Sequence, residues 1–264
     1  MDRDDRRMKH NFHTHTTRCK HAAGTDEQYV QAALAGGFDV LGFSDHTPWA
    51  FRTDYVSHCR MLPSQWADYK QSVLALKDKY QGQIAIRLGL ECEYYPKYID
   101  QLKRLKDDGC EYLILGNHFL YTEEEFPYTG SSCRQDAGVL EYAEQAVEAI
   151  RTGLYSYIAH PDLFMMYRDE LTPVCMEAAD MICQAAKEAH MPIEYNLLGL
   201  EGELTGQNRG YPNQDFWAYV RKWDNGVIIG VDAHDPDALR KSRVWDTAVS
   251  RLTAMGHRIV DHIL

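Results

Sequence analysis

Two histidines near the start of the chain, His13 and His15, are separated by a single residue. The residues from Lys9 to His13 have the pattern of a short β-strand. Side chains two positions apart on a strand point to the same side, so both imidazoles could reach one point in space. Imidazole is the commonest protein ligand of metal ions. The pair therefore predicts a metal site, to which other parts of the chain must add ligands.

Further candidate ligands follow other strand-like segments, each at a similar place. The whole set consists of His13, His15, His21, His46, Glu91, His118, His160, Asp232 and His234. Four to six ligands fill one metal site, so nine groups indicate three ions that share some ligands. The mixture of imidazole and carboxylate suits zinc, manganese or iron better than calcium or magnesium. His21 stands in a polar loop, where a solvated histidine is the alternative.

Seven apolar segments, each followed by a helical pattern, must position these residues. We expect strands at 9–13, 38–43, 84–90, 111–116, 156–159, 192–195 and 227–231, and a glycine-rich loop at 199–210. Seven strand-then-helix units in series predict parallel strands with helical crossovers. The carboxyl ends of such strands meet on one face, where the candidate ligands would gather. We find no linker, so we expect a single domain over residues 1–264.

The composition limits where the protein acts. Hydrophobic residues make up 45% of the 264 residues, but no apolar stretch is long enough to span a membrane. The stretch Met1–Arg7 is charged and lacks the apolar region of a signal peptide. The seven cysteines form no Cys-x-x-Cys pair, which is typical of reduced thiols. These features predict a cytoplasmic protein.

The net charge of −11 makes long nucleic acid an unfavourable partner, since an acidic surface repels phosphate backbones. Bound divalent metals would offset part of this charge. The charge therefore disfavours long nucleic acid, although a short basic patch remains possible, and the lack of an apolar span disfavours a membrane partner.

Six motifs in this order resemble those of the PHP (polymerase and histidinol phosphatase) superfamily. They are His13-Thr14-His15, Ser44-Asp45-His46, Gly89-Leu90-Glu91, His118-Phe119-Leu120, Ala159-His160-Pro161-Asp162 and Gly230-Val231-Asp232-Ala233-His234. The resemblance extends from about His10 to His234. The chain length and the runs 118–120 and 159–163 are most similar to the histidinol-phosphate phosphatase branch.

This resemblance implies a distorted (β/α)7 barrel, which is a TIM-like α/β fold, with a trinuclear metal site at the C-terminal ends of the strands. By position in the motifs, the first ion would be held by His13, His15, Glu91 and Asp232. Glu91 would bridge to a second ion held by His118 and His160. The third ion would be held by His21, His46 and His234.

The resemblance also implies hydrolysis of a phosphate monoester, with L-histidinol phosphate as the leading substrate and L-histidinol and phosphate as products. A metal-activated hydroxide would attack, because water bound to divalent metal has a lowered pKa. The sequence contains no recognisable serine- or cysteine-nucleophile motif. The metal ions are therefore expected to carry the catalysis.

Arg168 and Arg209 are candidates to bind the phosphate, because a guanidinium pairs well with its oxygens. Glu93 could be a ligand, could recognise a substrate amine, or could be a polar residue at the rim. After the sixth strand, 199–202 reads Gly-Leu-Glu-Gly where the phosphatase branch often has Gly-Leu-Arg-Lys. Arg209 could compensate for that difference.

Asp45 and Asp162 each neighbour a candidate ligand in sequence. We expect them to orient imidazoles or to be solvated.

Two other functions remain compatible with these motifs. A PHP-family phosphoesterase or nuclease that acts on another small phosphate ester or on a nucleotide would share the metal site, although a nuclease would favour a basic groove. A non-catalytic metal-binding barrel would have lost ligands, whereas all nine positions are filled here.

Overall fold

The structure, a computed structural model, describes residues 8–263, so the charged stretch Met1–Arg7 lies outside the described residues. Eight parallel strands form one sheet, and each strand pairs with the next along the chain. The strands are β1 (His10–Asn11), β2 (Val40–Phe43), β3 (Ala85–Cys92), β4 (Tyr112–Leu115), β5 (Tyr157–Ile158), β6 (Ile193–Asn196), β7 (Gly226–Gly230) and β8 (Arg258–Ile259).

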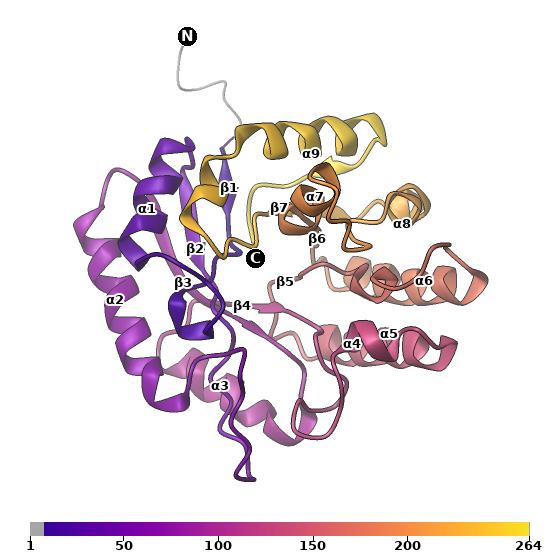
Figure 1. Ribbon diagram of the computed structural model, residues 1–264, viewed down its shortest axis with the longest axis horizontal. Helices are drawn as coiled ribbons and strands as arrows, with labels where there is room; N and C mark the ends of the chain where they lie inside the picture. The colour runs from indigo at the N-terminus through magenta and orange to yellow at the C-terminus, as the bar shows by residue number, and fades with distance from the viewer. Residues whose placement is uncertain (1–7, 264) are drawn as a thin grey trace.

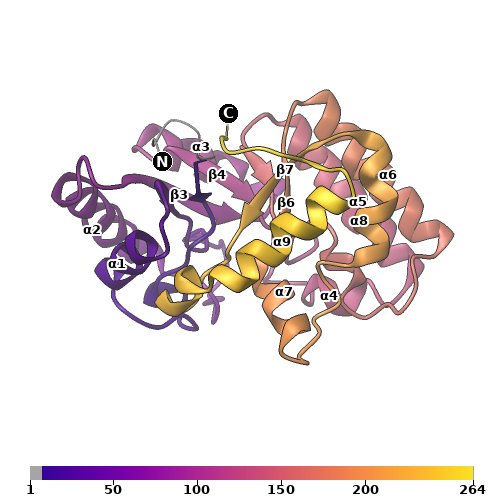
Figure 2. The same ribbon diagram turned by 90° about the horizontal axis from the view of Figure 1, so that it is seen from above.

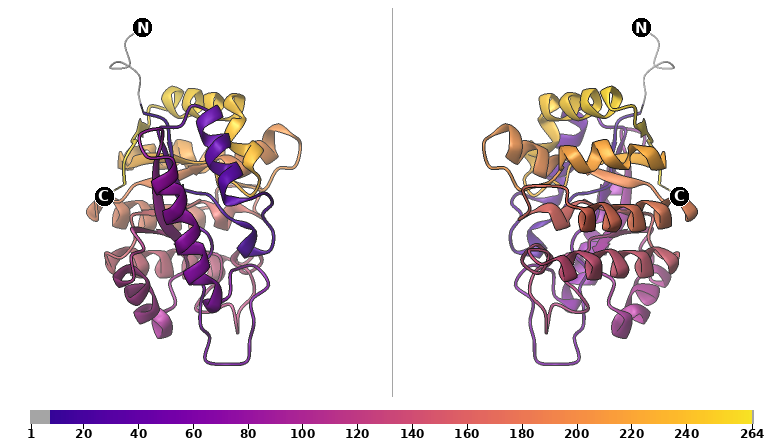
Figure 3. Two further views of the ribbon diagram at one scale, coloured as in Figure 1. Left: turned by 90° about the vertical axis from the view of Figure 1, so that its left-hand side faces the viewer. Right: turned by 90° about the vertical axis from the view of Figure 1, so that its right-hand side faces the viewer.

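The helices surround the strands, as Figures 1 and 2 show. They are α1 (Asp26–Ala35), α2 (Trp66–Lys79), α3 (Ile99–Asp107), α4 (Thr129–Ser132), α5 (Asp136–Arg151), α6 (Pro173–Glu188), α7 (Leu197–Leu204), α8 (Gln214–Val220) and α9 (Ser242–Ala254). Figure 3 shows α1 and α2 on one side of the barrel and α5 and α6 on the opposite side. Within residues 8–263, no helix has the length and apolar character needed to cross a lipid bilayer.

The barrel closes between its first and seventh strands. Thr14 forms a parallel bridge with Ala233. The peptide N–H of His15 donates to Ala233 O at 2.9 Å, and Ala233 N–H donates to His13 O at 3.2 Å. This seam joins segments near the two ends of the described chain. It places His13 and His15 beside Ala233 and so close to Asp232.

Local sequence signals account for several of these elements. Thr25 and Gln28 form the expected capping box at the start of α1, with Thr25 N–H donating to Gln28 Oε1 at 2.7 Å. Pro173 is the first residue of α6, where its missing N–H costs nothing. All four residues of β4 are buried, as expected for a parallel strand that is covered on both faces.

The predicted α/β barrel of seven strand–helix units is confirmed, with two differences. The tail from His257 contains an eighth strand, β8, which pairs with β7 through Gly226 and Val227. The expected glycine-rich loop at 199–210 begins inside helix α7. That helix forms because the Asn196 side chain accepts the Gly199 N–H at 3.0 Å and so caps its first turn.

Candidate metal centre

The nine candidate ligands converge at the C-terminal ends of the strands. They follow β1, β2, β4, β5 and β7, except for Glu91, which is the residue before the last one of β3. All of them except His13 line one cavity of about 360 Å³, and His13 is fully buried beside it. The structure thus gathers the whole predicted set.

The first group of ligands has the spacing of a tetrahedral metal site. Nε2 of His13 lies 3.4 Å from Asp232 Oδ1 and 3.5 Å from Glu91 Oε1. Nε2 of His15 lies 3.2 Å from Asp232 Oδ1 and 3.5 Å from Glu91 Oε2. Four ligands placed tetrahedrally at about 2.1 Å from an ion would lie about 3.4 Å from one another. His13, His15 and Asp232 could therefore hold one divalent ion together, with Glu91 close enough to add a ligand.

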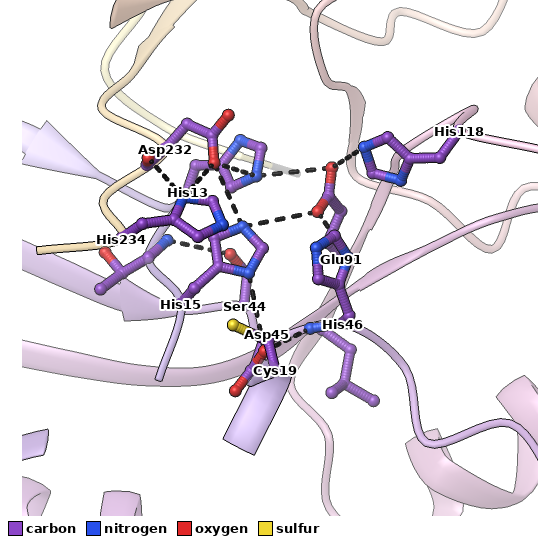
Figure 4. Close-up of polar contacts among 12 residues, drawn as sticks. His13, His15, Cys19, Ser44, Asp45, His46, Glu91, His118, Asp232 and His234 are labelled. Atoms are coloured by element: carbon purple, nitrogen blue, oxygen red, sulfur yellow. Dashed lines mark hydrogen bonds and ion pairs between the residues drawn. The ribbon is translucent and has the colours of Figure 1, made fainter. Parts of the chain in front are cut away.

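Glu91 lies at the centre of the cluster. Figure 4 shows its carboxylate between the rings of His15 and His118. Its Oε1 atom is 3.0 Å from His160 Nε2 and 3.3 Å from His118 Nε2. Its Oε2 atom is 3.1 Å from His46 Nδ1. Both oxygens thus face ring nitrogens on several sides, which is the placement that a bridging carboxylate needs.

A third group is formed by His21, His46 and His234, whose ligand atoms lie within 4.8 Å of one another. Nε2 of His234 is 3.0 Å from Nε2 of His21. Cys19 forms a similar group with His15 and His234, and the sequence analysis missed it. Its signal was its position between His15 and His21.

Several buried polar atoms of this cluster have no hydrogen-bond partner. Nε2 of His13, Nε2 of His15, Nδ1 of His46 and Oδ1 of Asp232 have no hydrogen-bond partner among the residues that the structure describes. Burying a polar atom without a hydrogen-bond partner costs free energy unless a ligand binds it. Their convergence, and the mixture of imidazole and carboxylate, fit divalent metal ions.

The electrostatics of the cluster favour a bound cation. Burial opposes a positive charge on His13, yet Asp232, Glu194 and Glu91 raise its pKa well above the ordinary value. Burial also opposes the charge on Glu91, yet the surrounding histidines hold its pKa well below the usual range. The site therefore retains negative carboxylates beside ring nitrogens, and a metal ion would take the place of the ring protons.

Four of the histidines have their Nδ1 atom next to an acceptor, which leaves Nε2 free to bind a metal. These contacts are His13 with Glu194 Oε1 at 2.8 Å, His118 with Glu93 Oε1 at 3.1 Å, His21 with Cys19 O at 2.8 Å and His234 with Asp232 O at 3.1 Å. The acceptors fix both the tautomer and the orientation of each ring.

Glu194 is a functional candidate that the sequence analysis missed. It is fully buried within β6, which carries none of the predicted ligands. Besides its contact with His13, it accepts the N–H of His160 at 3.0 Å and an N–H of the Asn196 side chain at 3.1 Å. The available signal was a carboxylate within a strand predicted to be buried.

Glycines make room for the two central carboxylates. A Cβ atom on Gly116 would lie 2.4 Å from Glu91 Oε1, and one on Gly230 would lie 1.7 Å from Glu194 Oε1. Both distances are too short for any side chain. The position of Glu91 therefore requires Gly116, just after β4, and the position of Glu194 requires Gly230, the last residue of β7.

Replacing Glu194 with glutamine is expected to lower metal affinity by about 10- to 100-fold, since outer partners of a metal-binding histidine have effects of this size. The amide would weaken the acceptor at His13 Nδ1 while keeping the shape of the side chain. Competition with a metal-binding dye measures the effect. Glu177→Gln, at an exposed position on α6, is the control. Equal affinity in both variants would show that Glu194 has no such role.

Two of the candidate ligands have strained backbones. His160 has a φ of 29° and Asp232 has a φ of 53°, in the left-handed region that residues other than glycine rarely adopt. Such residues cost of order 1–3 kcal/mol each, and they cluster at active sites and ligand clamps. Their occurrence at two strand ends in this cluster points to a functional constraint.

The structure separates the two arginines proposed for phosphate. Arg209 lines the cavity, and its guanidinium has no hydrogen bond or ion pair with any residue in the described part of the chain. Arg168 does not line it: its guanidinium donates to Cys133 O at 2.7 Å and to Asp136 at 2.8 Å. Only Arg209 is therefore free to meet a ligand there.

Glu93 also lines the cavity but is buried and ion-paired with Arg60 at 2.9 Å. Although burial disfavours its charge, Arg60 and His118 lower the pKa of Glu93 to about 2. It is therefore a carboxylate that supports His118.

The two aspartates have different roles. Oδ1 of Asp45 lies 3.6 Å from Nδ1 of His15, so Asp45 is near an imidazole as expected. The carboxylate of Asp162 instead accepts the N–H of Asn213 at 2.7 Å and the indole N–H of Trp217 at 3.0 Å. It therefore anchors the segment that follows Arg209.

Aromatic and aliphatic side chains complete the cavity. They are Phe119, Tyr128, Leu198 and Tyr211. The ring of Tyr128 stacks on His118 with 6.1 Å between the ring centroids, and the ring of Tyr211 meets His160 edge-on at 5.9 Å. The cavity thus joins an ionic side to an apolar one.

Comparison with known proteins agrees with this geometry. The family model of the PHP domain matches residues 11–197. The histidinol-phosphatase of Bacillus subtilis is 27% identical over 255 residues, which cover 86% of this chain and 94% of that protein. The probable histidinol-phosphatase of Deinococcus radiodurans is 28% identical over 236 residues, which cover 85% of each chain.

A solved structure shares the fold. It is the histidinol phosphate phosphatase of Lactococcus lactis in complex with zinc, L-histidinol and phosphate. The TM-score is 0.73 at 17% identity, and the match covers 97% of this chain and 96% of that one.

Proposed function

Because the chain belongs to the PHP domain family, we propose that it is a metal-dependent phosphomonoesterase that hydrolyses L-histidinol phosphate to L-histidinol and phosphate. The observation that carries the proposal is the cluster of nine ligands that opens onto a cavity with an unpaired arginine. The activity of the two similar histidinol-phosphatases supports the choice of substrate.

The cavity suits the two halves of this substrate. The phosphate would lie against the ionic side, where Arg209 could pair with its oxygens. The imidazole and its carbon chain would lie against Tyr128, Tyr211 and Phe119, since aromatic rings favour stacked or edge-on partners.

Three divalent ions are proposed for the three ligand groups, with zinc, manganese or iron as the candidates. When bound, they would supply positive charge that activates a water molecule and offsets the charge of the phosphate. Glu91 and Asp232 keep the ligand cluster anionic, while Glu194 and Glu93 orient His13 and His118.

No protein nucleophile is needed. Cys59 is the one cysteine among the residues that line the cavity. Burial raises the pKa of its thiol, so little thiolate is available at neutral pH. A covalent cysteine intermediate is therefore disfavoured.

The cytoplasm is the proposed location. All seven cysteines are free within residues 8–263, as expected in a reducing compartment.

The direct test is phosphate release from L-histidinol phosphate by the metal-loaded protein, beside a panel of sugar phosphates, nucleotides and dinucleotides. His160→Ala is the inactive control. Strong preference for L-histidinol phosphate, lost in the control, is the expected result. Turnover of nucleotides instead would favour a nucleotide hydrolase. Bound metal without turnover of any ester would favour a non-catalytic barrel.

Replacing Arg209 with alanine is expected to lower kcat/KM for L-histidinol phosphate by about 10- to 100-fold, mainly through KM, because a hydrogen bond to a charged group contributes about 1.5–3 kcal/mol. Arg168→Ala removes an arginine outside the cavity, so its kcat/KM should stay within about 3-fold of the wild-type value. Steady-state kinetics of both variants check this. The reverse order of effects would transfer the phosphate-binding role to Arg168.

A further inference from the structure

Arg60 is a buried arginine to which the proposed function assigns no role. It lies in the long loop between β2 and α2 and is only 1% exposed. Its guanidinium contacts two buried carboxylates, Glu93 and Glu123, and donates to Thr47 O at 3.4 Å. A buried charge is stable only when it is paired in this way. The position of the pair beside the metal centre indicates a role beyond folding.

One branch of this network leads to a metal ligand. Arg60 binds Glu93 with both terminal nitrogens, at 3.1 Å to Oε2 and 2.9 Å to Oε1. Oε2 of Glu93 also accepts the indole N–H of Trp49 at 3.0 Å, and Oε1 lies 3.1 Å from Nδ1 of His118. On its other side, His118 presents Nε2 to Glu91 at 3.3 Å. A continuous chain of contacts therefore joins Arg60 to the centre of the cluster.

The other branch holds a loop. Nε of Arg60 donates to Glu123 Oε2 at 2.6 Å, and the hydroxyl of Tyr55 donates to Glu123 Oε1 at 3.0 Å. Figure 3 shows the segments around residues 55 and 123 side by side at the lower edge of the molecule. The branch through Glu123 thus fastens two long loops together without contacting a proposed ligand.

We propose that Arg60 is a positioning residue of the metal centre, which fixes Glu93 so that His118 presents Nε2 to the second ion. This inference rests on the proposed role of His118 as a ligand. A bidentate guanidinium–carboxylate pair has a fixed plane, so Glu93 cannot rotate away from the imidazole. Without Arg60, the buried carboxylate would lose its countercharge and leave the ring unsupported.

The two branches allow a matched comparison. Arg60→Met removes both branches, Glu93→Gln weakens only the branch to His118, and Glu123→Gln weakens only the branch to the loop. His118→Ala defines the effect of losing the ligand itself. The readout is the number of metal equivalents at fixed free zinc, measured by inductively coupled plasma mass spectrometry, with affinity from chelator competition.

Arg60→Met and Glu93→Gln are each expected to lower the affinity for one of the bound metal ions by about 10- to 100-fold. His118→Ala should lower it further. Glu123→Gln should keep wild-type metal content. Added metal should restore kcat of the Arg60 variant with KM unchanged. The metal affinity of Arg60→Lys should lie between that of Arg60→Met and that of the wild type. An ammonium can pair with Glu93 but cannot hold its carboxylate in one plane.

Wild-type metal affinity in Arg60→Met and Glu93→Gln would overturn the inference. An equal loss of metal affinity in Glu123→Gln would also overturn it, because it would show that Arg60 acts by anchoring the loop. If Arg60→Met does not fold, as judged by circular dichroism, Glu93→Gln decides. Because metal content is read without a substrate, failure on L-histidinol phosphate alone would overturn the proposed substrate and leave this inference standing. Unchanged metal content in His118→Ala would overturn the inference itself.

Discussion

Replacing Glu91 with glutamine is expected to slow phosphate release severely and to weaken metal binding at more than one position. Both oxygens of Glu91 face ring nitrogens, from His13, His118 and His160 on one side and His15 and His46 on the other. An amide offers one oxygen and no charge, so it cannot bridge two ions. We expect kcat to fall by roughly 10³-fold, or about 4 kcal/mol of transition-state stabilisation.

The measurement combines single-turnover kinetics with metal analysis of the same sample. Glu177→Gln makes the same chemical change at an exposed position and should match the wild type in both. A Glu91→Gln protein that keeps full metal content and activity would show that this carboxylate does not bridge ions, and the assignment of ligands around it would be wrong.

Removal of metal by a chelator is expected to inactivate the protein and to lower its melting temperature by roughly 10 °C. Ligands that bind only the folded state stabilise it by about 4 kcal/mol at a thousand times Kd, and each kcal/mol corresponds to about 2–4 °C in a domain of this size. The physical cause here is the loss of countercharge for Glu91 and Asp232, which are buried together at the ends of β3 and β7.

Differential scanning calorimetry before and after dialysis against chelator checks the shift. Readdition of zinc, manganese or iron should restore the melting temperature and the activity together, whereas magnesium should restore neither at the same concentration. An apoprotein with the same melting temperature and the same turnover would contradict a metal-dependent mechanism.

The convergence of the ligands could be predicted from the sequence because the strand ends of a parallel barrel share one face. His13, Glu91 and Asp232 are far apart in the chain, but each follows or ends an apolar segment. The family and the barrel predicted from these motifs are confirmed. Periodicity therefore specified where these side chains would meet.

The supporting contacts could not be predicted, because they join residues with no shared pattern. Glu194 on β6 contacts His13 after β1, and Arg60 reaches Glu93 from an irregular loop. Helix α7 was missed because glycines normally break helices, whereas here the cap at Asn196 and close packing admit Gly199. In each case, tertiary contacts outweighed the local signal.

The seam between His13–His15 and Ala233 has a consequence for biosynthesis. The first group of ligands combines His13 and His15, which follow β1, with Asp232, which follows β7 and is therefore synthesised much later. A nascent chain therefore carries the His-x-His pair without Asp232 until β7 has been made. We therefore expect the first group to bind metal only once the barrel has closed, so that the folded barrel would make the choice among competing ions.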